Sequence, residues 1–283
     1  MVKLVRIGLF CLIIMSANLV HSQDSICHDP EEYLSRTLPV LYINTTDNMP
    51  VTSRDEYLLG TYYLDAEGID EFESIGSAEN PLALQIKGRG NASWQHPKKP
   101  YRLKLEKKAP LLGMPKNKHW VLLASYADWR CHARDYVYLK IASMMRMPWT
   151  PGIVPCELVL NGDYMGMYYL VEKIRVDKER VNIVEQSDLC ANTDSITGGW
   201  LLEIDNYHEA NQINMTDKNG TIIRVTYHTP QVLSNVQYNY ISDLLNKTNN
   251  AINTNDKSSR EFEEYYCCPI KVKIGKITLP QPR

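Results

Sequence analysis

The stretch LALQIKGRGNASWQHPKKPYRLKLE, residues 82–106, decides the fold. Apolar and polar side chains alternate near both of its ends, which is typical of β-strands with one buried face. We therefore predict strands at Leu82–Lys87 and Tyr101–Glu106. Because successive side chains of a strand point to opposite faces, Arg102 and Lys104 share the face opposite the apolar residues.

Working outward, the same alternation predicts further strands on both sides of this stretch. Between the two strand groups we predict a helix at Asp128–Met145, with Asp128 as its N-cap and one apolar face made of Ala133, Val137, Ile141 and Met144. Asn161-Gly162 is a strong hairpin signal between two later strands. The other predicted elements are strands at Leu38–Ile43, Tyr57–Leu64, His119–Ala124, Val154–Leu160, Tyr164–Glu172, Trp200–Asp205 and Thr221–Val225, and a helix at Val236–Leu245. The predicted class is α+β, with antiparallel strands first and mixed helices and strands after them.

The N-terminus has the features of a secretory signal. Lys3 and Arg6 precede a short apolar run, and small residues follow up to a predicted cleavage point near Ser22. The run is too short to cross a bilayer, and no later segment is long and apolar enough to do so. We therefore expect a secreted, periplasmic or cell-surface protein without a membrane span after cleavage.

Composition and charge exclude some classes of function. The chain has 283 residues, 44% of them apolar, with five Trp and eighteen Tyr, which indicates a hydrophobic core. Cleavage would remove Lys3 and Arg6, so the formal charge of −2 becomes −4. This mild acidity argues against nucleic acid as a partner, because binding by counterion release needs a basic surface. No Cys-x-x-Cys pair exists, so the six cysteines after the leader fit no zinc pattern. These cysteines could form disulfide bonds or remain as buried free thiols.

Common nucleotide, protease and esterase motifs are absent, and two basic segments remain. In Lys87-Gly88-Arg89-Gly90-Asn91 the glycines would let the backbone approach an anion, for which Arg89 and Asn91 supply donors. A tight turn with a solvated arginine and no ligand would have the same sequence pattern. Likewise, Lys104 on its strand could face a site that binds nucleotide phosphates, or it could lie on a wet surface.

Several motifs follow one another along the chain, namely GRGNASW from residue 88, KKPYRLKL from residue 98, LGMPK from residue 112, HWVLLA from residue 119, PCELVLNGDYMGMY from residue 155, VEKI from residue 171, RVNI from residue 180 and GGWLLEID from residue 198. Their order and spacing resemble the CotH (spore coat protein H) kinase family. The resemblance is dense over Leu82–Asp205 and fades on either side.

The resemblance implies an atypical protein-kinase-like fold that binds ATP with Mg or Mn and phosphorylates Ser or Thr of a protein. It also implies cofactor-binding residues, which are Arg89, Asn91, Lys99 and Lys104 on the phosphate side, and Glu157 and Glu172 to orient a lysine or stabilise the core. A purely structural role for Glu172 stays open. No catalytic residue and no metal ligand can be assigned.

The family pattern stops before the end of the sequence. In the family the catalytic and metal-binding aspartates lie downstream of the helix that begins near Val236, and we find no matching segment. We therefore expect an incomplete C-terminal lobe and no useful kinase activity from this chain. The expected organisation is a signal peptide at 1–22, a strand-rich segment at 23–80, a partial CotH kinase-like domain at 81–248, and a polar linker and tail outside the family at 249–283.

Two other functions remain open. The first is a non-catalytic coat or surface module that contacts other proteins through the same scaffold. The second is a secreted carbohydrate-binding protein, suggested by aromatic and acidic residues on a strand-rich chain. The expected partner is a protein substrate or a coat or surface protein, and the sequence does not indicate an oligomeric state.

Overall fold

A computed structural model describes residues 30–128, 131–145, 147–205, 207–216, 219–254, 271–273 and 276–278. The predicted signal peptide lies outside the described residues, as does most of the predicted tail. Among the helices of the described part, none is long and apolar enough to cross a membrane.

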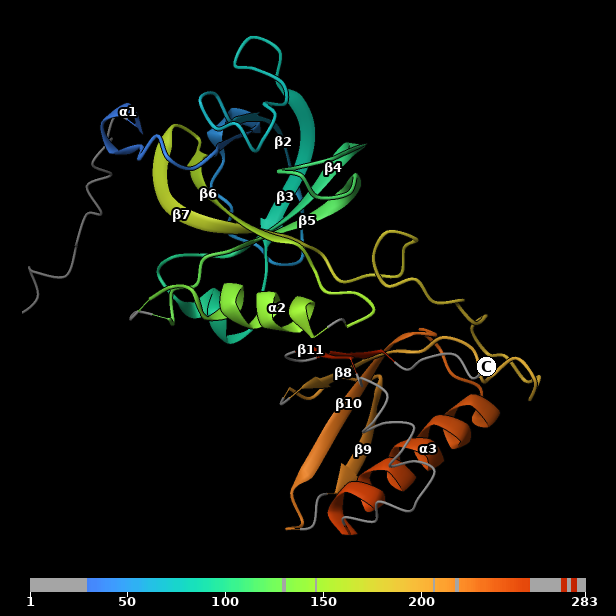
Figure 1. Ribbon diagram of the computed structural model, residues 1–283. Helices are drawn as coiled ribbons and strands as arrows, with labels where there is room; N and C mark the ends of the chain where they lie inside the picture. The colour runs from blue at the N-terminus through green and yellow to red at the C-terminus, as the bar shows by residue number, and fades with distance from the viewer. Residues whose placement is uncertain are drawn as a thin grey trace, which may run out of the picture.

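The first half of the described chain forms a closed barrel (Figure 1). Its strands follow the order β1-β2-β3-β4-β5-β7-β6, and a parallel pair between β1 and β6 closes the ring, whereas every other neighbouring pair is antiparallel. The strands are β1 (Val40–Thr45), β2 (Leu58–Asp65), β3 (Leu82–Gly88), β4 (Tyr101–Ala109), β5 (Asn117–Leu123), β6 (Ile153–Leu160) and β7 (Asp163–Glu172). Three short helices accompany them, namely α1 (Pro30–Tyr33), η1 (Thr46–Asn48) and η2 (Ala92–Gln95).

Alternate residues of the strands fill the barrel. Ile86, Leu103 and Trp120 come from three neighbouring strands and are excluded from solvent. Because side chains alternate along a strand, the residues between them point out of the barrel. This alternation explains why the sequence pattern predicted all seven of these strands, to within two residues at most boundaries.

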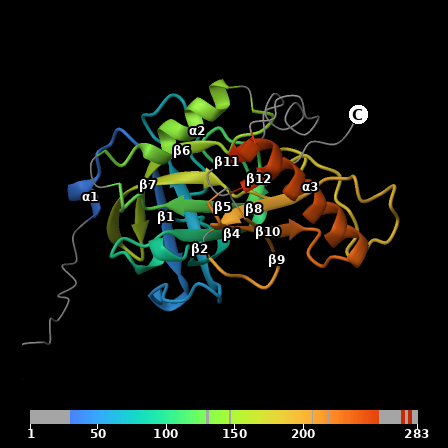
Figure 2. The ribbon, with the colours of Figure 1, turned by 90° about the horizontal axis from the view of Figure 1, so that it is seen from below.

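The second half of the described chain forms a smaller layer of sheet and helix. Its sheet has the order β11-β12-β8-β10-β9, with β8 (Leu201–Asp205), β9 (Gln212–Thr216), β10 (Ile222–Thr229), β11 (Lys271–Lys273) and β12 (Lys276–Thr278). Helix α3 (Asn235–Thr254) packs on it through Ile241 and Leu245, which contact a cluster around Trp200. This layer lies below the barrel in Figure 1, and the view from that side in Figure 2 places β8 and β10 over β4 and β5.

Helix α2 (Arg134–Met144) begins later than predicted and turns a different face to the protein. Tyr136 and Leu139 pack on the outside of the barrel, where the Tyr136 ring stacks on that of Tyr169 with 5.9 Å between centroids. Val137 and Ile141, placed on the buried face by the sequence pattern, are 45% and 47% exposed. The predicted face was wrong because an 11-residue helix with apolar residues on several sides does not define a single stripe.

The predicted fold class was also wrong. The described residues do not form a protein-kinase-like α+β arrangement with mixed helices, because they form a strand-rich closed barrel beside a small sheet. The strands β6 and β7, which we expected to begin a second group, complete the first one. Their pairing joins β6 to β1, whose partner residues such as Val40 and Glu157 are 117 positions apart, and β7 to β5. Alternation within a strand carries no signal for such distant partners.

Candidate functional site

The outer side of β3, β4 and β5 carries a cluster of basic residues. Lys87 of β3 pairs in register with Arg102 of β4, and Lys104 of β4 pairs with His119 of β5. All of them alternate with residues that fill the barrel, so their side chains share the outer surface. We call Lys87, Arg89, Arg102, Lys104 and His119 the basic face.

At one end of the basic face, Arg89 lies close to charges of both signs. Burial and the positive charge of Arg102 lower the pKa of Arg89, whereas Glu203 of β8 and Asp135 of α2 act to raise it. The second sheet approaches this end directly, because the Tyr207 hydroxyl accepts a hydrogen bond of 3.1 Å from the backbone N–H of Ala92. Arg89 therefore lies where the barrel, α2 and the second sheet come together.

At the other end, His119 is surrounded by cations. Burial, together with the positive charges of Arg175, Lys173, Lys104 and Arg180, lowers the pKa of His119 to about 4. Its Nδ1 atom is buried and has no hydrogen-bond partner among the described residues. Nε of Arg102 and Nε of Arg175 are also buried and have no hydrogen-bond partner within the described part of the chain. Buried polar atoms of this kind are rare in proteins and call for a ligand, an ion or a water.

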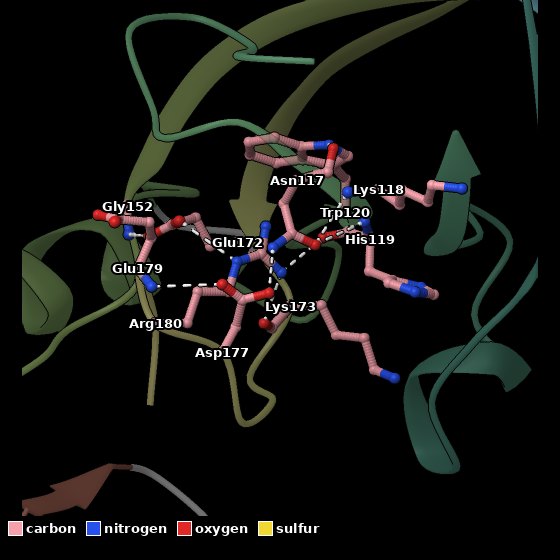
Figure 3. Close-up of polar contacts among 10 residues, drawn as sticks. All are labelled: Asn117, Lys118, His119, Trp120, Gly152, Glu172, Lys173, Asp177, Glu179 and Arg180. Atoms are coloured by element: carbon pink, nitrogen blue, oxygen red, sulfur yellow. Dashed lines mark hydrogen bonds and ion pairs between the residues drawn. The ribbon is translucent and has the colours of Figure 1, made fainter. Parts of the chain in front are cut away.

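Behind His119, the buried Arg180 holds two strands together (Figure 3). Its Nη1 donates to the carbonyl oxygens of His119 at 2.7 Å and of Lys173 at 2.8 Å, and its guanidinium lies 5.1 Å from the centre of the Trp120 ring. Its Nε lies 3.4 Å from the Glu172 carboxylate. Arg180 thus fixes the backbone at two residues whose side chains border the basic face.

The glycine-flanked turn that follows β3 is packed by its own neighbours. A Cβ atom on Gly88 would lie 2.4 Å from the Trp94 ring, and one on Gly90, which has a φ of +84°, would lie 2.0 Å from the Ser93 hydroxyl. Both glycines therefore make room for side chains of the turn. Asn91 accepts a hydrogen bond of 3.0 Å from Arg54 at this turn and is exposed.

The other predicted site residues lie in different surroundings. Lys99 donates to the carbonyl oxygen of Trp94 at 2.8 Å and lies over its ring, which ties it to the turn. Glu157 is buried near α1, where it accepts hydrogen bonds from the backbone of Ser35 and, at 2.6 Å, from the Tyr164 hydroxyl. Glu172 accepts from the backbone N–H of Gly152 at 2.9 Å and pairs with Arg180.

The structure therefore brings Arg89 and Lys104 onto one face. The other four predicted residues, Asn91, Lys99, Glu157 and Glu172, make structural contacts away from that face. Sequence reasoning noticed that Arg102 points outward but did not select it, and it missed His119, Lys173, Arg175 and Arg180. A usable signal existed for His119 alone, since it lies on a predicted strand with the same alternation. The other three follow β7 in a segment without periodicity.

A divalent metal does not fit the described residues. No group of three or more His, Cys, Asp or Glu side chains in the described part of the chain is arranged to hold one. The described residues do include a pair of such side chains, His228 with Glu203, at 2.6 Å across β8 and β10. Phosphate groups fit better, because Nε of Arg102 and Nδ1 of His119 are buried without a partner among the described residues and phosphate oxygens are acceptors.

Comparison with known proteins agrees with the motif order in the sequence. A family model described as CotH kinase protein matches residues 86–273, which is about two thirds of the 283 residues. The match includes β4, β5 and the last three residues of β3, and it covers every residue of the basic face. No curated protein matches the chain significantly. The chain belongs to the CotH kinase family.

Proposed function

We propose that this chain binds the phosphates of ATP on its basic face, which is the binding step that precedes phosphorylation of protein Ser or Thr by an active member of its family. One observation carries the proposal: four basic side chains from three adjacent strands share one surface, and two buried nitrogens among them, Nε of Arg102 and Nδ1 of His119, have no hydrogen-bond partner among the described residues. Membership of the CotH kinase family supports the choice of ATP among phosphate ligands.

The chemistry available to the described residues is electrostatic. Lys104 and Arg102 lie two residues apart on one strand and would offset the charge of neighbouring phosphate groups. Arg89 would bind at the edge of the same surface, where Glu203 and Asp135 act to raise its pKa against burial and the charge of Arg102. Phosphoryl transfer also needs metal ions and an acid–base residue at the acceptor hydroxyl. Since no described cluster fits a metal, we assign no step to one.

A titration of ADP and ATP by calorimetry, with and without Mg²⁺ or Mn²⁺, tests the proposal. Each charged hydrogen bond to a phosphate contributes about 1.5–3 kcal/mol, so Lys104→Gln should weaken binding about ten- to 150-fold. Lys107→Gln is the matched control, because Lys107 is an exposed lysine on the same strand. Absence of binding by the unaltered chain, or equal affinities for both variants, would contradict the proposal.

A transfer assay with γ-labelled ATP and a mixture of protein substrates then separates binding from catalysis. The expectation from the sequence is nucleotide binding without measurable transfer. Label in Ser or Thr that disappears with Lys104→Gln would overturn that expectation and show an active kinase.

We also propose that residues 1–22 direct export of the chain. The supporting features are Lys3 and Arg6 before a short apolar run. Mass spectrometry of protein collected outside the producing cells should give a mature N-terminus at Gln23. Intact protein retained inside the cells, with Met1 or Val2 at its start, would argue against export.

A further inference from the structure

The two ends of the basic face differ in how their charge is balanced. Arg89 has two carboxylates within electrostatic reach, Glu203 and Asp135. At the His119 end, every charge that acts appreciably on the pKa of His119 is positive. An anion that seeks uncompensated positive charge should therefore bind at the His119 end.

This end is assembled from three segments of the chain. Lys104 comes from β4, His119 from β5, and Lys173 and Arg175 from the residues directly after β7. Figure 3 shows the side chains of His119 and Lys173 extending to the same side, away from the guanidinium of Arg180 that holds their carbonyls. A rigid backbone thus presents these side chains to one region of the surface.

The acidic residues nearby already have partners. Glu172 pairs with Arg180 and accepts from Gly152, while Asp177 accepts from the Asn117 amide at 3.2 Å and from the backbone of Glu179. The buried Nδ1 of His119 and Nε of Arg175 have no partner within the described residues. These two nitrogens are therefore available to interact with a ligand.

We propose that Lys104, His119, Lys173 and Arg175 form a subsite for a phosphoryl group, and that His119 takes up a proton when the anion binds. The identity of the ligand as a nucleotide rests on the function proposed above. The subsite itself requires a phosphoryl group only, so free polyphosphate and a nucleotide are both possible sources of it.

Proton uptake follows from the charges that face His119. They are Lys104 on β4, Lys173 directly after β7, and Arg175 and Arg180 on the segment beyond it. The nearby carboxylates of Glu172 and Asp177 act on Arg180. Gln85 on β3, opposite Lys104, is neutral. Without ligand, burial and this surplus of positive charge keep the imidazole neutral near pH 7, because they hold its pKa at about 4. A bound phosphoryl group reverses the local field and favours the imidazolium. Protonated His119 then has two N–H donors for phosphate oxygens.

Calorimetric titrations at pH 7.5 and 5.5, in buffers of different ionisation enthalpy, measure this uptake directly. The probes are ADP, inorganic tripolyphosphate and adenosine, and the proteins are the full chain and its His119→Gln variant. Because the ligand's own protonation is the same for both proteins, the ratio of their affinities isolates His119. If binding returns the pKa of His119 to about 6.5, the ratio should rise about tenfold between pH 7.5 and 5.5.

Two controls make the result specific. His208→Gln removes an exposed histidine of the second layer and should behave like the unaltered chain. The imidazole resonance of His119, followed by NMR in the unaltered chain with and without tripolyphosphate, should show a raised pKa in the bound state. This measurement needs no substitution and holds even if His119→Gln does not fold.

The outcomes separate the two proposals. Equal pH dependence for the unaltered chain and His119→Gln, or an unchanged NMR titration of His119 in the bound state, overturns the subsite and leaves ATP binding intact. Tripolyphosphate binding with His119-dependent proton uptake, but no ADP binding, supports the subsite and overturns the proposed function. Failure of both phosphate probes to bind overturns both, whereas adenosine should not bind at this subsite in any case.

Discussion

Arg180 and Glu172 form an ion pair in a place from which solvent is almost excluded. Nε of Arg180 lies 3.4 Å from Oε1 of Glu172, and the two side chains are 0% and 4% exposed. The same guanidinium binds the carbonyl oxygens of His119 and Lys173, so it connects β5 to the end of β7. A buried charge that loses its partner is costly, because it keeps the desolvation penalty without the attraction.

The first prediction is that Arg180→Met destabilises the protein by about 3–5 kcal/mol, because it leaves Glu172 charged and two carbonyls unsatisfied. Urea unfolding measures the effect. Lys247→Met is the control, since Lys247 pairs with Asp243 at 2.8 Å on the exposed surface of α3 and such a pair contributes about 0.5 kcal/mol. The double variant with Glu172→Met should lose less stability than the sum of the single variants. Additive losses would show that the two residues are not coupled.

The local elements of this fold were predictable where a few adjacent residues determine them. The hairpin between β6 and β7 is the clearest case, because Asn161 and Gly162 adopt φ values of +54° and +85° that their residue types tolerate. The strand β4 is another, since Tyr101, Leu103 and Leu105 are all buried as alternation requires.

The arrangement of the elements was not predictable in the same way. Closure of the barrel depends on parallel pairing of β1 with β6, in which Val40 faces Glu157 across a long separation in sequence. The site has the same difficulty, because Arg180 reaches His119 from a loop 61 residues away. Contacts of this kind depend on which surfaces meet in three dimensions, whereas periodicity reports only which face of one element is buried.

The second prediction concerns the turn after β3. Gly88→Ala would place a methyl group 2.4 Å from the Trp94 ring, so we expect a loss of about 1–3 kcal/mol and a displaced ring. Urea unfolding and the fluorescence of the tryptophans measure the two effects. Adding Trp94→Leu should recover part of the stability, because it removes the atoms that collide. No recovery would mean that the glycine is required by the backbone instead.

The third prediction separates two lysines that the sequence grouped together. Lys99 is tied to Trp94 by a hydrogen bond of 2.8 Å and lies over its ring, whereas Lys104 belongs to the basic face. Lys99→Gln should therefore lower the free energy of unfolding by about 1 kcal/mol and change the affinity for ADP less than about twofold. Lys104→Gln should instead weaken ADP binding and leave the free energy of unfolding nearly unchanged. A large loss of ADP affinity with Lys99→Gln would return Lys99 to the phosphate-binding residues.

The fourth prediction is a pH dependence of stability in the absence of ligand. Burial and the neighbouring cations hold the pKa of His119 at about 4 in the folded protein, against about 6.5 in the unfolded chain. Between these values the unfolded state binds more protons, so stability falls as the pH is lowered through this window and is constant above it. His119→Gln removes this contribution, so its stability should fall less steeply when urea unfolding is compared at pH 7.5, 6 and 5. Parallel curves for the two proteins would show that His119 titrates normally. The same positive surroundings thus predict two opposite responses to acid, since protonation of His119 opposes folding without an anion and strengthens binding when a phosphoryl group is present.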